Sequence, residues 1–582
     1  MTPKKTSVAR KTTRQKNVVP DVVEAVEEVE AIPVMSPVIQ EPVVLQEVSL
    51  VPDNMIYKRP NQLLILALML GWAFDFLFWK HTVGVNFAVF MSLCFLGGSY
   101  WLLSSGLKPN RRSLWLLVPF LFFAVVTFLR QEPLTSFLAF MFTVLSIGLF
   151  GSSYIGGRWF QYGLLDYFHK FFLLIGDMLT GVMSYIFKAK QIQTNLDSGK
   201  NGFPIWGLLR GLLFALPIVI CFGTLLAAGD LVFKQKLDDV LALDDLGENI
   251  FRGILILFYA YILAGSLLHA ALKSKDESLV GENNTVIKPF LGFTESTVIL
   301  GSVSILFLAF VIVQFQYFFG GETNIGVEGF TYSQYARRGF NELVTVAFFS
   351  LVLILGLSTV TRRETEVQRK TYSWLSVVLA GLVLIILFSA YQRILLGIGW
   401  HGFSRLRLYP RIFLIWLALL LITVVLLEVL QRERHFAFAA VLASVGFAVS
   451  LVLFNVDAAI IRHNVYRAWH GRNLNVPHLV SLSTDAIPAV ADEFLSADLP
   501  PFTREGVGAI LACYRYNESR THISEDDWRS FNLSKWQAHQ ALDTVRPYLA
   551  GYIIRYKNWP VRVRTPSGYI FNCEDNASAE EE

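Results

Sequence analysis

The sequence predicts an all-α polytopic membrane protein, and three observations support this class. Of the 582 residues, 54% are hydrophobic and only 16% are charged, whereas an ordinary soluble domain has about 25% charged residues. The mean hydropathy is +0.47, and the chain contains 47 Phe and 13 Trp. Its apolar residues gather in runs of about 20, the length that crosses a bilayer. Four cysteines exclude a disulfide-rich scaffold, and a net charge of +4 gives no indication of nucleic-acid binding.

Residues 1–55 differ from the rest of the chain, because a basic stretch is followed by an acidic, Val- and Pro-rich one without sustained periodicity. This composition predicts a disordered tail. The first apolar run begins only near Leu63, too late for a cleavable signal peptide. We therefore expect the first span to stay as a membrane anchor.

A multi-pass transmembrane domain is predicted over residues 56–455. It contains about eleven apolar runs of membrane-spanning length. They lie near 63–79, 84–105, 114–129, 134–155, 205–228, 250–272, 296–318, 342–361, 374–396, 412–430 and 435–455.

The segment 160–187 is also long enough to cross, but it carries Asp166, His169, Lys170 and Asp177. We interpret it as an interfacial helix, because the loops on one side of the membrane then hold 17 Lys and Arg and the opposite short loops hold nine. Positively charged loops face the cytoplasm. If the segment crosses instead, most of this bias is lost. The prediction is therefore a cytoplasmic N-terminus and an extracytoplasmic C-terminal domain.

The C-terminal domain is predicted over residues 456–575, with 576–582 as a frayed acidic end. Helix-capping residues predict a mostly helical fold, and the alternating stretch 552–571 predicts a β-hairpin. Cys513 and Cys573 are the only cysteines of this region. An extracytoplasmic compartment would allow them to form a disulfide.

Several segments resemble a known family, among them 75–90, 208–233, 313–321, 331–344 and 455–468. The family consists of uncharacterised bacterial multi-pass membrane proteins and is known only as domain of unknown function number four-one-seven-three. The resemblance implies a bacterial membrane protein. It implies no activity, cofactor or substrate.

Polar residues near the outer ends of several spans form a candidate outer-leaflet cluster, since an ionisable group inside a span needs a partner, water or an interface. The cluster consists of Asp75, Gln314, Gln316, Arg337, Arg338, Glu342 and Arg393. Asp75 and Arg393 are the charge pair we expect within it. The alternative is that these are separate interfacial residues whose side chains reach water or headgroups.

Common catalytic signatures are absent: the sequence has no GxxxxGK[ST], HExxH, GxSxG or CxxC. An acidic loop with Asp238 and Asp239 could attract a divalent cation, but its spacing matches no metal motif. We therefore predict no catalytic residues, no metal site and no cofactor.

The sequence leaves three functions open. The first is a non-enzymatic scaffold, sensor or permease-like component of the bacterial cell envelope, with the bilayer and an envelope protein, bound by the C-terminal domain, as partners. The second is a transferase that uses a lipid carrier at the outer leaflet, an idea that rests on architecture alone. The third is an ion- or proton-coupled transporter, although transporters place polar groups near the midplane, and here they lie toward one leaflet.

Overall fold

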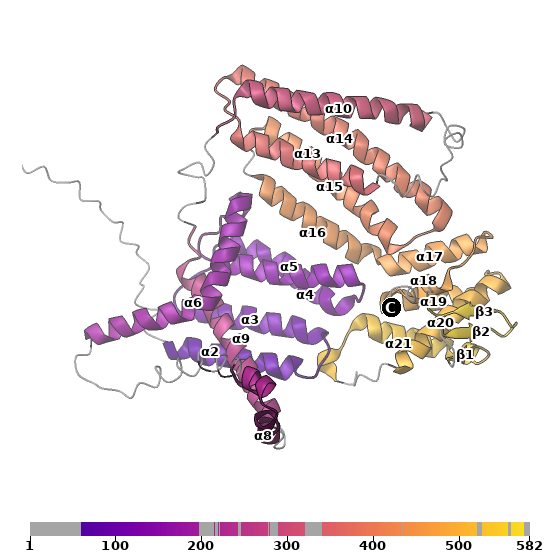
Figure 1. Cartoon of the computed structure of the whole chain (residues 1–582), viewed down its shortest axis with the longest axis horizontal. Helices are drawn as coiled ribbons and strands as arrows, with labels where there is room; N and C mark the ends of the chain where they lie inside the picture. Colours follow the sequence, from indigo (N-terminus) through magenta and orange to yellow (C-terminus); the bar gives the residue numbers. More distant parts are fainter. Residues whose placement is uncertain are drawn as a thin grey trace, which may run out of the picture. The chain divides into compact units, whose positions relative to one another are not determined.

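The structure is a computed structural model (Figure 1). The residues that it describes are 60–196, 215, 219, 222–241, 246–276, 279, 289–319, 340–432, 435–520, 527–556 and 560–574. The predicted tail, the acidic end and most of the predicted span 205–228 lie outside these ranges.

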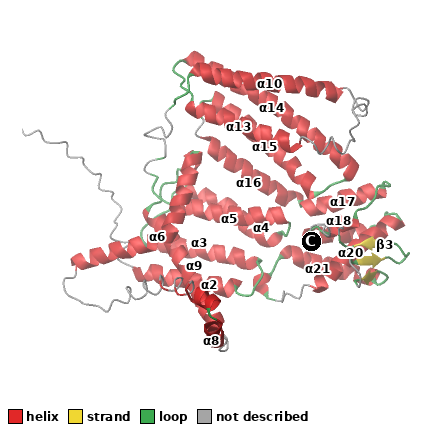
Figure 2. Cartoon of the chain, in the orientation of Figure 1, coloured by secondary structure: helices red, strands yellow, loops and turns green. Residues whose placement is uncertain are grey.

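Most of the described chain is helical (Figure 2). Ten of the helices in these ranges are long and apolar enough to cross a membrane. They are α2 (Pro60–Phe78), α3 (Val85–Ser104), α5 (Pro133–Ser152), α6 (Leu164–Leu196), α9 (Leu246–Leu272), α10 (Phe293–Phe319), α13 (Phe340–Val360), α14 (Glu366–His401), α15 (Arg405–Val429) and α16 (Phe436–Phe454). A shorter apolar helix combines η1 (Ser113–Leu116) and α4 (Leu117–Leu129), and α8 covers Leu231–Leu241. The predicted all-α polytopic class is confirmed.

Helix α6 coincides with the segment predicted to lie in the interface. Its residues Leu164–Lys188 also meet the length and hydropathy of a span. The interfacial location stays a prediction.

Local sequence explains where two of these helices begin. The Glu132 side chain accepts hydrogen bonds from the backbone N–H groups of Leu134 and Thr135, and Pro133 occupies the first position of α5, where its missing N–H costs no hydrogen bond. Thr365 and Gln368 form a reciprocal capping box at the start of α14. Between such caps the apolar runs become helices because every backbone polar group in a bilayer needs an internal partner.

The helices pack in two groups. In the first, α2 and α6 pack on α9, and α3, α4 and α5 complete the group. In the second, α14 packs on α10, α13 and α15, while α16 packs on both α15 and α5. The contact of α2 with α9 is close: a Cβ on Gly71 would lie 2.3 Å from the backbone oxygen of Ile256. Small residues of this kind allow membrane helices to approach backbone to backbone.

The C-terminal region, defined here as the described residues of 456–574, is mostly helical. Its elements are α17 (Val456–Trp469), α18 (Val476–Val480), η5 (Thr484–Ala486), α19 (Ile487–Leu495), α20 (Pro501–Arg520), η6 (Trp528–Ser530), α21 (Leu533–Val545), η7 (Arg546–Leu549), β1 (Ile553–Arg555), β2 (Arg562–Arg564) and β3 (Ile570–Asn572). The strands form one antiparallel sheet in the order β1-β2-β3, so the predicted hairpin continues into a third strand.

Buried side chains of α19, α20 and β2 form the core of this region, with Val490, Ile510 and Val563 fully buried. The same core includes Leu408 of α15 and Leu451 of α16. Apolar packing is therefore continuous between the C-terminal region and the ends of these membrane helices.

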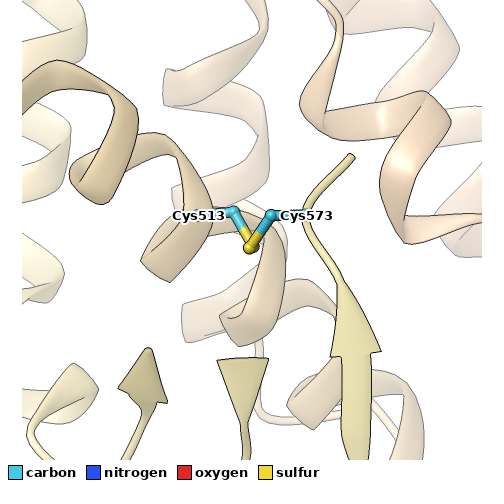
Figure 3. Close-up of a disulfide and its surroundings, with 2 residues drawn as sticks. All are labelled: Cys513 and Cys573. Carbon is cyan, nitrogen blue, oxygen red and sulfur yellow. A yellow bond between two sulfur atoms is a disulfide. The ribbon is translucent and has the colours of Figure 1, made fainter. Parts of the chain in front are cut away.

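A disulfide joins Cys513 of α20 to Cys573, which directly follows β3 (Figure 3). The two Cα atoms are 5.5 Å apart, and the bond closes a loop with a sequence separation of 60. In the chain-entropy account, a loop of this length stabilises the fold by about 4 kcal/mol. The disulfide thus fixes the sheet to the central helix of the C-terminal region.

Candidate functional site

Asp75, the first residue of the predicted polar cluster, is 3% exposed on α2. Its carboxylate accepts hydrogen bonds from Arg252 of α9, at 3.1 Å from Nε and 2.6 Å from Nη2. The structure therefore pairs Asp75 with Arg252 instead of the expected Arg393. The reason is helix packing: α2 lies along α9, whereas Arg393 belongs to α14, which packs on α10, α13 and α15.

A second set of polar contacts between the two helices lies just after the end of α2. Lys80 donates to Glu248 at 2.8 Å, and the indole nitrogen of Trp79 donates to the same carboxylate at 2.8 Å. The first turn of α9 is therefore held against the turn that follows α2.

Other members of the predicted cluster lie in the second helix group. Ser389 of α14 donates to the side-chain oxygen of Gln314 on α10 at 2.6 Å. Glu342 is exposed in the first turn of α13, and Arg393 is half-buried on α14. Arg337, Arg338 and the side chain of Gln316 lie outside the described residues. Asp75 belongs to the first helix group, whereas the other described members, Gln314, Glu342 and Arg393, belong to the second.

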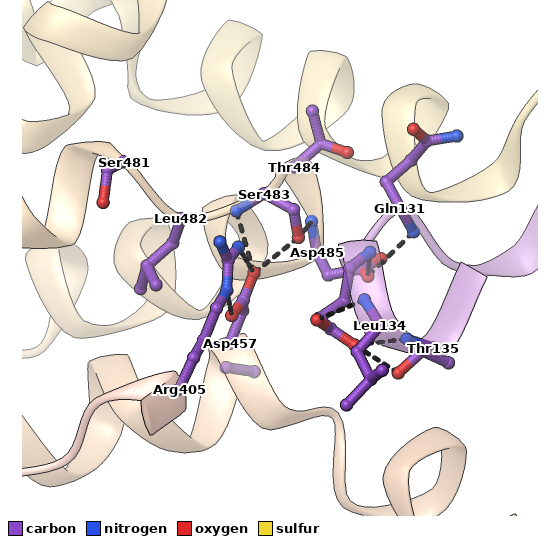
Figure 4. A network of polar contacts seen from close by, with 12 residues as sticks. Gln131, Leu134, Thr135, Arg405, Asp457, Ser481, Leu482, Ser483, Thr484 and Asp485 are labelled. Atoms are coloured by element: carbon purple, nitrogen blue, oxygen red, sulfur yellow. Dashed lines mark hydrogen bonds and ion pairs between the residues drawn. The ribbon is translucent and has the colours of Figure 1, made fainter. Parts of the chain in front are cut away.

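A more extensive polar network joins the membrane helices to the C-terminal region (Figure 4). We call it the junction and define it by Arg405, Asp457, Asp485, Glu132 and Tyr409. These residues come from the start of α15, from α17, from η5 and from the start of α5. Sequence reasoning did not select them as site residues.

The central contact of the junction is an ion pair between Arg405 and Asp457. The two side chains make two parallel hydrogen bonds, Nε to Oδ1 at 2.8 Å and Nη2 to Oδ2 at 2.5 Å. Asp457 is fully buried, and it also accepts from the backbone N–H and hydroxyl of Ser483, at 2.8 and 2.6 Å. Bidentate pairing and the added donors compensate for removing the carboxylate from water.

The second part of the junction holds the loop between α4 and α5. One carboxylate oxygen of Asp485 accepts from the backbone N–H groups of Gln131 and Glu132, each at 2.9 Å. The hydroxyl of Tyr409 donates to Glu132. Burial raises the pKa of Asp485 above its ordinary value, while the hydrogen bonds that it accepts oppose that shift.

A separate contact joins the C-terminal region to the turn between α2 and α3. The backbone N–H of Val85 donates to the carbonyl of Phe531 at 2.9 Å, and Arg529 donates to the carbonyl of Phe76 at 2.7 Å. A Cβ on Gly84 would lie 2.6 Å from the Phe531 oxygen. Glycine at position 84 therefore permits a direct backbone contact. Beside this contact, hydrogen bonding to Arg529 holds the pKa of Asp527 well below its usual range.

These contacts place three hairpin turns at the same end of the helices. The turns lie between α2 and α3, between α4 and α5, and between α14 and α15, and the C-terminal region contacts all three. At the last turn, the Asn464 side chain accepts from the backbone N–H of Phe403 at 3.1 Å and donates to its carbonyl at 2.8 Å. We call this end of the helices the domain end.

No cluster of three or more His, Cys, Asp or Glu suited to a metal is found among the described residues. The Arg405–Asp457 pair of the junction is saturated by protein partners. The junction therefore fixes the C-terminal region to helices that are distant in sequence.

The apolar helices and the C-terminal region docked on their turns define an integral multi-pass membrane protein. Residues 117–493 match the model of a family described as Domain of unknown function (DUF4153). The chain belongs to this family, so the number inferred from the resemblance is corrected to DUF4153. All five junction residues lie within the matched range. No curated protein and no solved structure matches the chain.

Proposed function

We propose that the protein is a non-enzymatic scaffold or sensor of the bacterial cell envelope, and that its C-terminal region binds a protein partner on the extracytoplasmic side. The observation that carries the proposal is the buried Arg405–Asp457 pair with its neighbours in the junction. A partner bound to the C-terminal region would act on the ends of α5 and α15 through these contacts. A flexible linker would not transmit partner binding to these helix ends.

The extracytoplasmic location has two supports. In the predicted topology, the short loops on the side of the C-terminal region carry nine Lys and Arg and the loops on the other side carry 17, and the more positive loops face the cytoplasm. The disulfide between Cys513 and Cys573 is an independent support, because disulfides persist in oxidising compartments.

The proposed topology also fits the paths of α6 and α9. Glu248 at the start of α9 contacts Lys80 at the domain end, whereas Asp276, just after α9, contacts Tyr162 and Lys170 around the start of α6. Helix α6 therefore begins at the end opposite to the start of α9. The predicted topology, with 160–187 in the interface and one crossing predicted at 205–228, gives the odd number of crossings that this arrangement requires.

The transferase alternative receives less support. Its candidate carboxylate, Asp75, is engaged by Arg252 through two nitrogen atoms. A carboxylate in a bidentate ion pair is a poor general base, because proton uptake would break the pair.

Photo-crosslinking in intact cells tests the proposed function. A crosslinking amino acid is placed at Tyr548 or Tyr556, both exposed in the C-terminal region, and at Lys108 in the loop after α3 as the matched control. We expect one protein at near-stoichiometric yield from the C-terminal positions and none of it from position 108. Turnover of a lipid-linked substrate by the purified protein, or crosslinks to lipid alone from every position, would overturn the proposal.

The side of the membrane is tested by thiol labelling. Ala497→Cys places a thiol on an exposed position of the C-terminal region, and Lys108→Cys places one on an exposed position at the opposite end. A non-permeant maleimide should label position 497 in intact cells and position 108 only after lysis. The reverse pattern would place the C-terminal region in the cytoplasm.

A further inference from the structure

A buried acid, a histidine and a lysine meet where α6 packs on α9, at the end opposite to the domain end. Nδ1 of His269 lies 2.8 Å from one carboxylate oxygen of Asp177, and the ammonium of Lys273 donates to the other oxygen at 2.7 Å. His269 is 1% exposed and Asp177 is 8% exposed. Ionisable groups buried in membrane helices are costly and usually serve a function.

The backbones of the two helices are in direct contact beside this group. A Cβ on Gly265 would lie 2.6 Å from the backbone oxygen of Asp177 and 2.7 Å from Cα of Met178. The position of Asp177 relative to α9 is therefore set by backbone packing. This backbone contact holds the Cα of Asp177 close to α9, and the hydrogen bond to His269 orients its carboxylate.

The histidine has one nitrogen that the described residues do not use. Since the Asp177 carboxylate can only accept, Nδ1 carries a hydrogen and donates it. Nε2 then presents a lone pair, and it is buried without a hydrogen-bond partner among the described residues. A buried polar atom without a hydrogen-bond partner is energetically unfavourable. A proton at Nε2 would convert this unpaired acceptor into part of a charged ring.

We propose that Asp177 and His269 form a proton-binding site, and that Nε2 of His269 takes up the proton. This inference goes beyond the proposed scaffold or sensor function. A new N–H bond forms at Nε2, no other covalent bond breaks, and the ring gains one positive charge. The Nδ1–H bond to Asp177 is kept and becomes charge-assisted.

Two features favour the charged ring, whereas burial and two nearby cations oppose it. Asp177 lies in contact, and His269 lies in the last turn of α9, where the helix dipole favours a cation. Lys273 and Lys170 are the cations near His269 and oppose a further positive charge. Lys170 is itself paired with Asp276 at 2.9 Å.

The remaining elements around α9 add little charge to the site. Helices α3 and α5 contain no Asp, Glu, Lys, Arg or His. Helix α2 contributes only Asp75, which is paired with Arg252 near the opposite end of α9. On α6, Asp166 accepts from the backbone of Gly163, and His169 is exposed.

Proton uptake at His269 has a specific consequence for Lys273. The carboxylate of Asp177 would then contact two cations, the buried His269 ring and the Lys273 ammonium, whose side chain is 53% exposed. The more exposed ammonium loses less on returning to water. Lys273 therefore leaves, and the contact between α6 and the end of α9 changes with the protonation of His269.

The test is a histidine titration on the full-length chain in lipid nanodiscs. The imidazole rings are labelled with ¹⁵N and followed from pH 8 to pH 5, and His269→Gln identifies the signals of His269 among those of the ten histidines. We expect a ring with hydrogen only on Nδ1 at pH 8 and a doubly protonated ring at pH 5. A ring that keeps one protonation state over this whole range overturns the proposal.

Two carboxylate variants separate the site from a general effect of charge. Asp177→Asn should remove the His269 titration from this range, because the neutral amide no longer stabilises the charged ring. Asp75→Asn is the matched control, since it neutralises a buried carboxylate near the other end of α9, and it should leave the titration unchanged. An unchanged titration in Asp177→Asn would overturn the pairing. If that variant does not fold, the titration of the unaltered chain still decides whether the site binds a proton.

Discussion

The Arg405–Asp457 pair of the junction and the α6–α9 contact both bury a carboxylate beside a cation, yet they differ in how many of their polar atoms have a hydrogen-bond partner. At the junction, Asp457 receives two bonds from Arg405 and two from Ser483. At the α6–α9 contact, one nitrogen of His269 has no partner among the described residues, and Lys273 is half-exposed. A saturated ion pair fixes a structure, whereas an incomplete one leaves room for a proton. The first contact suits attachment and the second suits a switch.

The largest expected effect is the loss of one partner of the junction pair. Arg405→Met leaves Asp457 buried without its cation, which should lower the free energy of unfolding by about 3–5 kcal/mol. The measurement is thermal or denaturant unfolding in nanodiscs. The double variant Arg405→Met/Asp457→Leu should recover part of this loss, since it leaves no buried charge. A loss below about 1 kcal/mol in the single variant would contradict the role given to the pair.

Removal of the disulfide should have the next largest effect. Cys513→Ser should destabilise the C-terminal region by about 2–4 kcal/mol, because the unfolded chain regains the freedom of the loop that the bond closes. Unfolding with and without a reductant measures this loss. The reductant should lower the stability of the unaltered chain and leave that of Cys513→Ser unchanged. Equal sensitivity of both proteins would argue against the bond.

Sequence reasoning predicted the elements more successfully than their partners. The apolar runs predicted the helices because length and hydropathy are local properties. The partner of Asp75 could not be predicted in this way, because the choice between Arg252 and Arg393 depends on which helices pack together. Glu132 was missed although it precedes Pro133, a local signal of a helix start. That signal would have identified a cap, but not its contact with Tyr409 from α15.

A smaller effect is expected at the turn between α2 and α3. Gly84→Ala would place a methyl group 2.6 Å from the Phe531 oxygen, so the C-terminal region must shift there. The expected cost is about 1–3 kcal/mol, measured by unfolding. Gly301→Ala in α10 is the control, because a Cβ at Gly301 meets nothing within 4 Å, and it should be neutral. Equal effects of both substitutions would show that the turn is not in close contact.

The smallest effect concerns pH and Asp485. Burial raises its folded-state pKa above the ordinary value of 3.8, so the folded protein binds this proton more tightly than the unfolded chain does. The contribution to stability is therefore present below pH 3.8 and is lost as pH rises through the folded-state pKa. Unfolding at a series of pH values should show this loss in the unaltered chain and not in Asp485→Asn. A difference of opposite sign would contradict the burial of Asp485.

The most direct test of the central claim is hydrogen exchange of the full-length chain in nanodiscs, compared with Arg405→Met. The claim is that the junction makes the C-terminal region and the turns of the membrane helices one cooperative unit. Arg405→Met should therefore lower protection together in three segments, namely 131–136, 404–412 and 483–487. Loss of protection in 404–412 alone would show that the C-terminal region and the helices are not coupled through the junction.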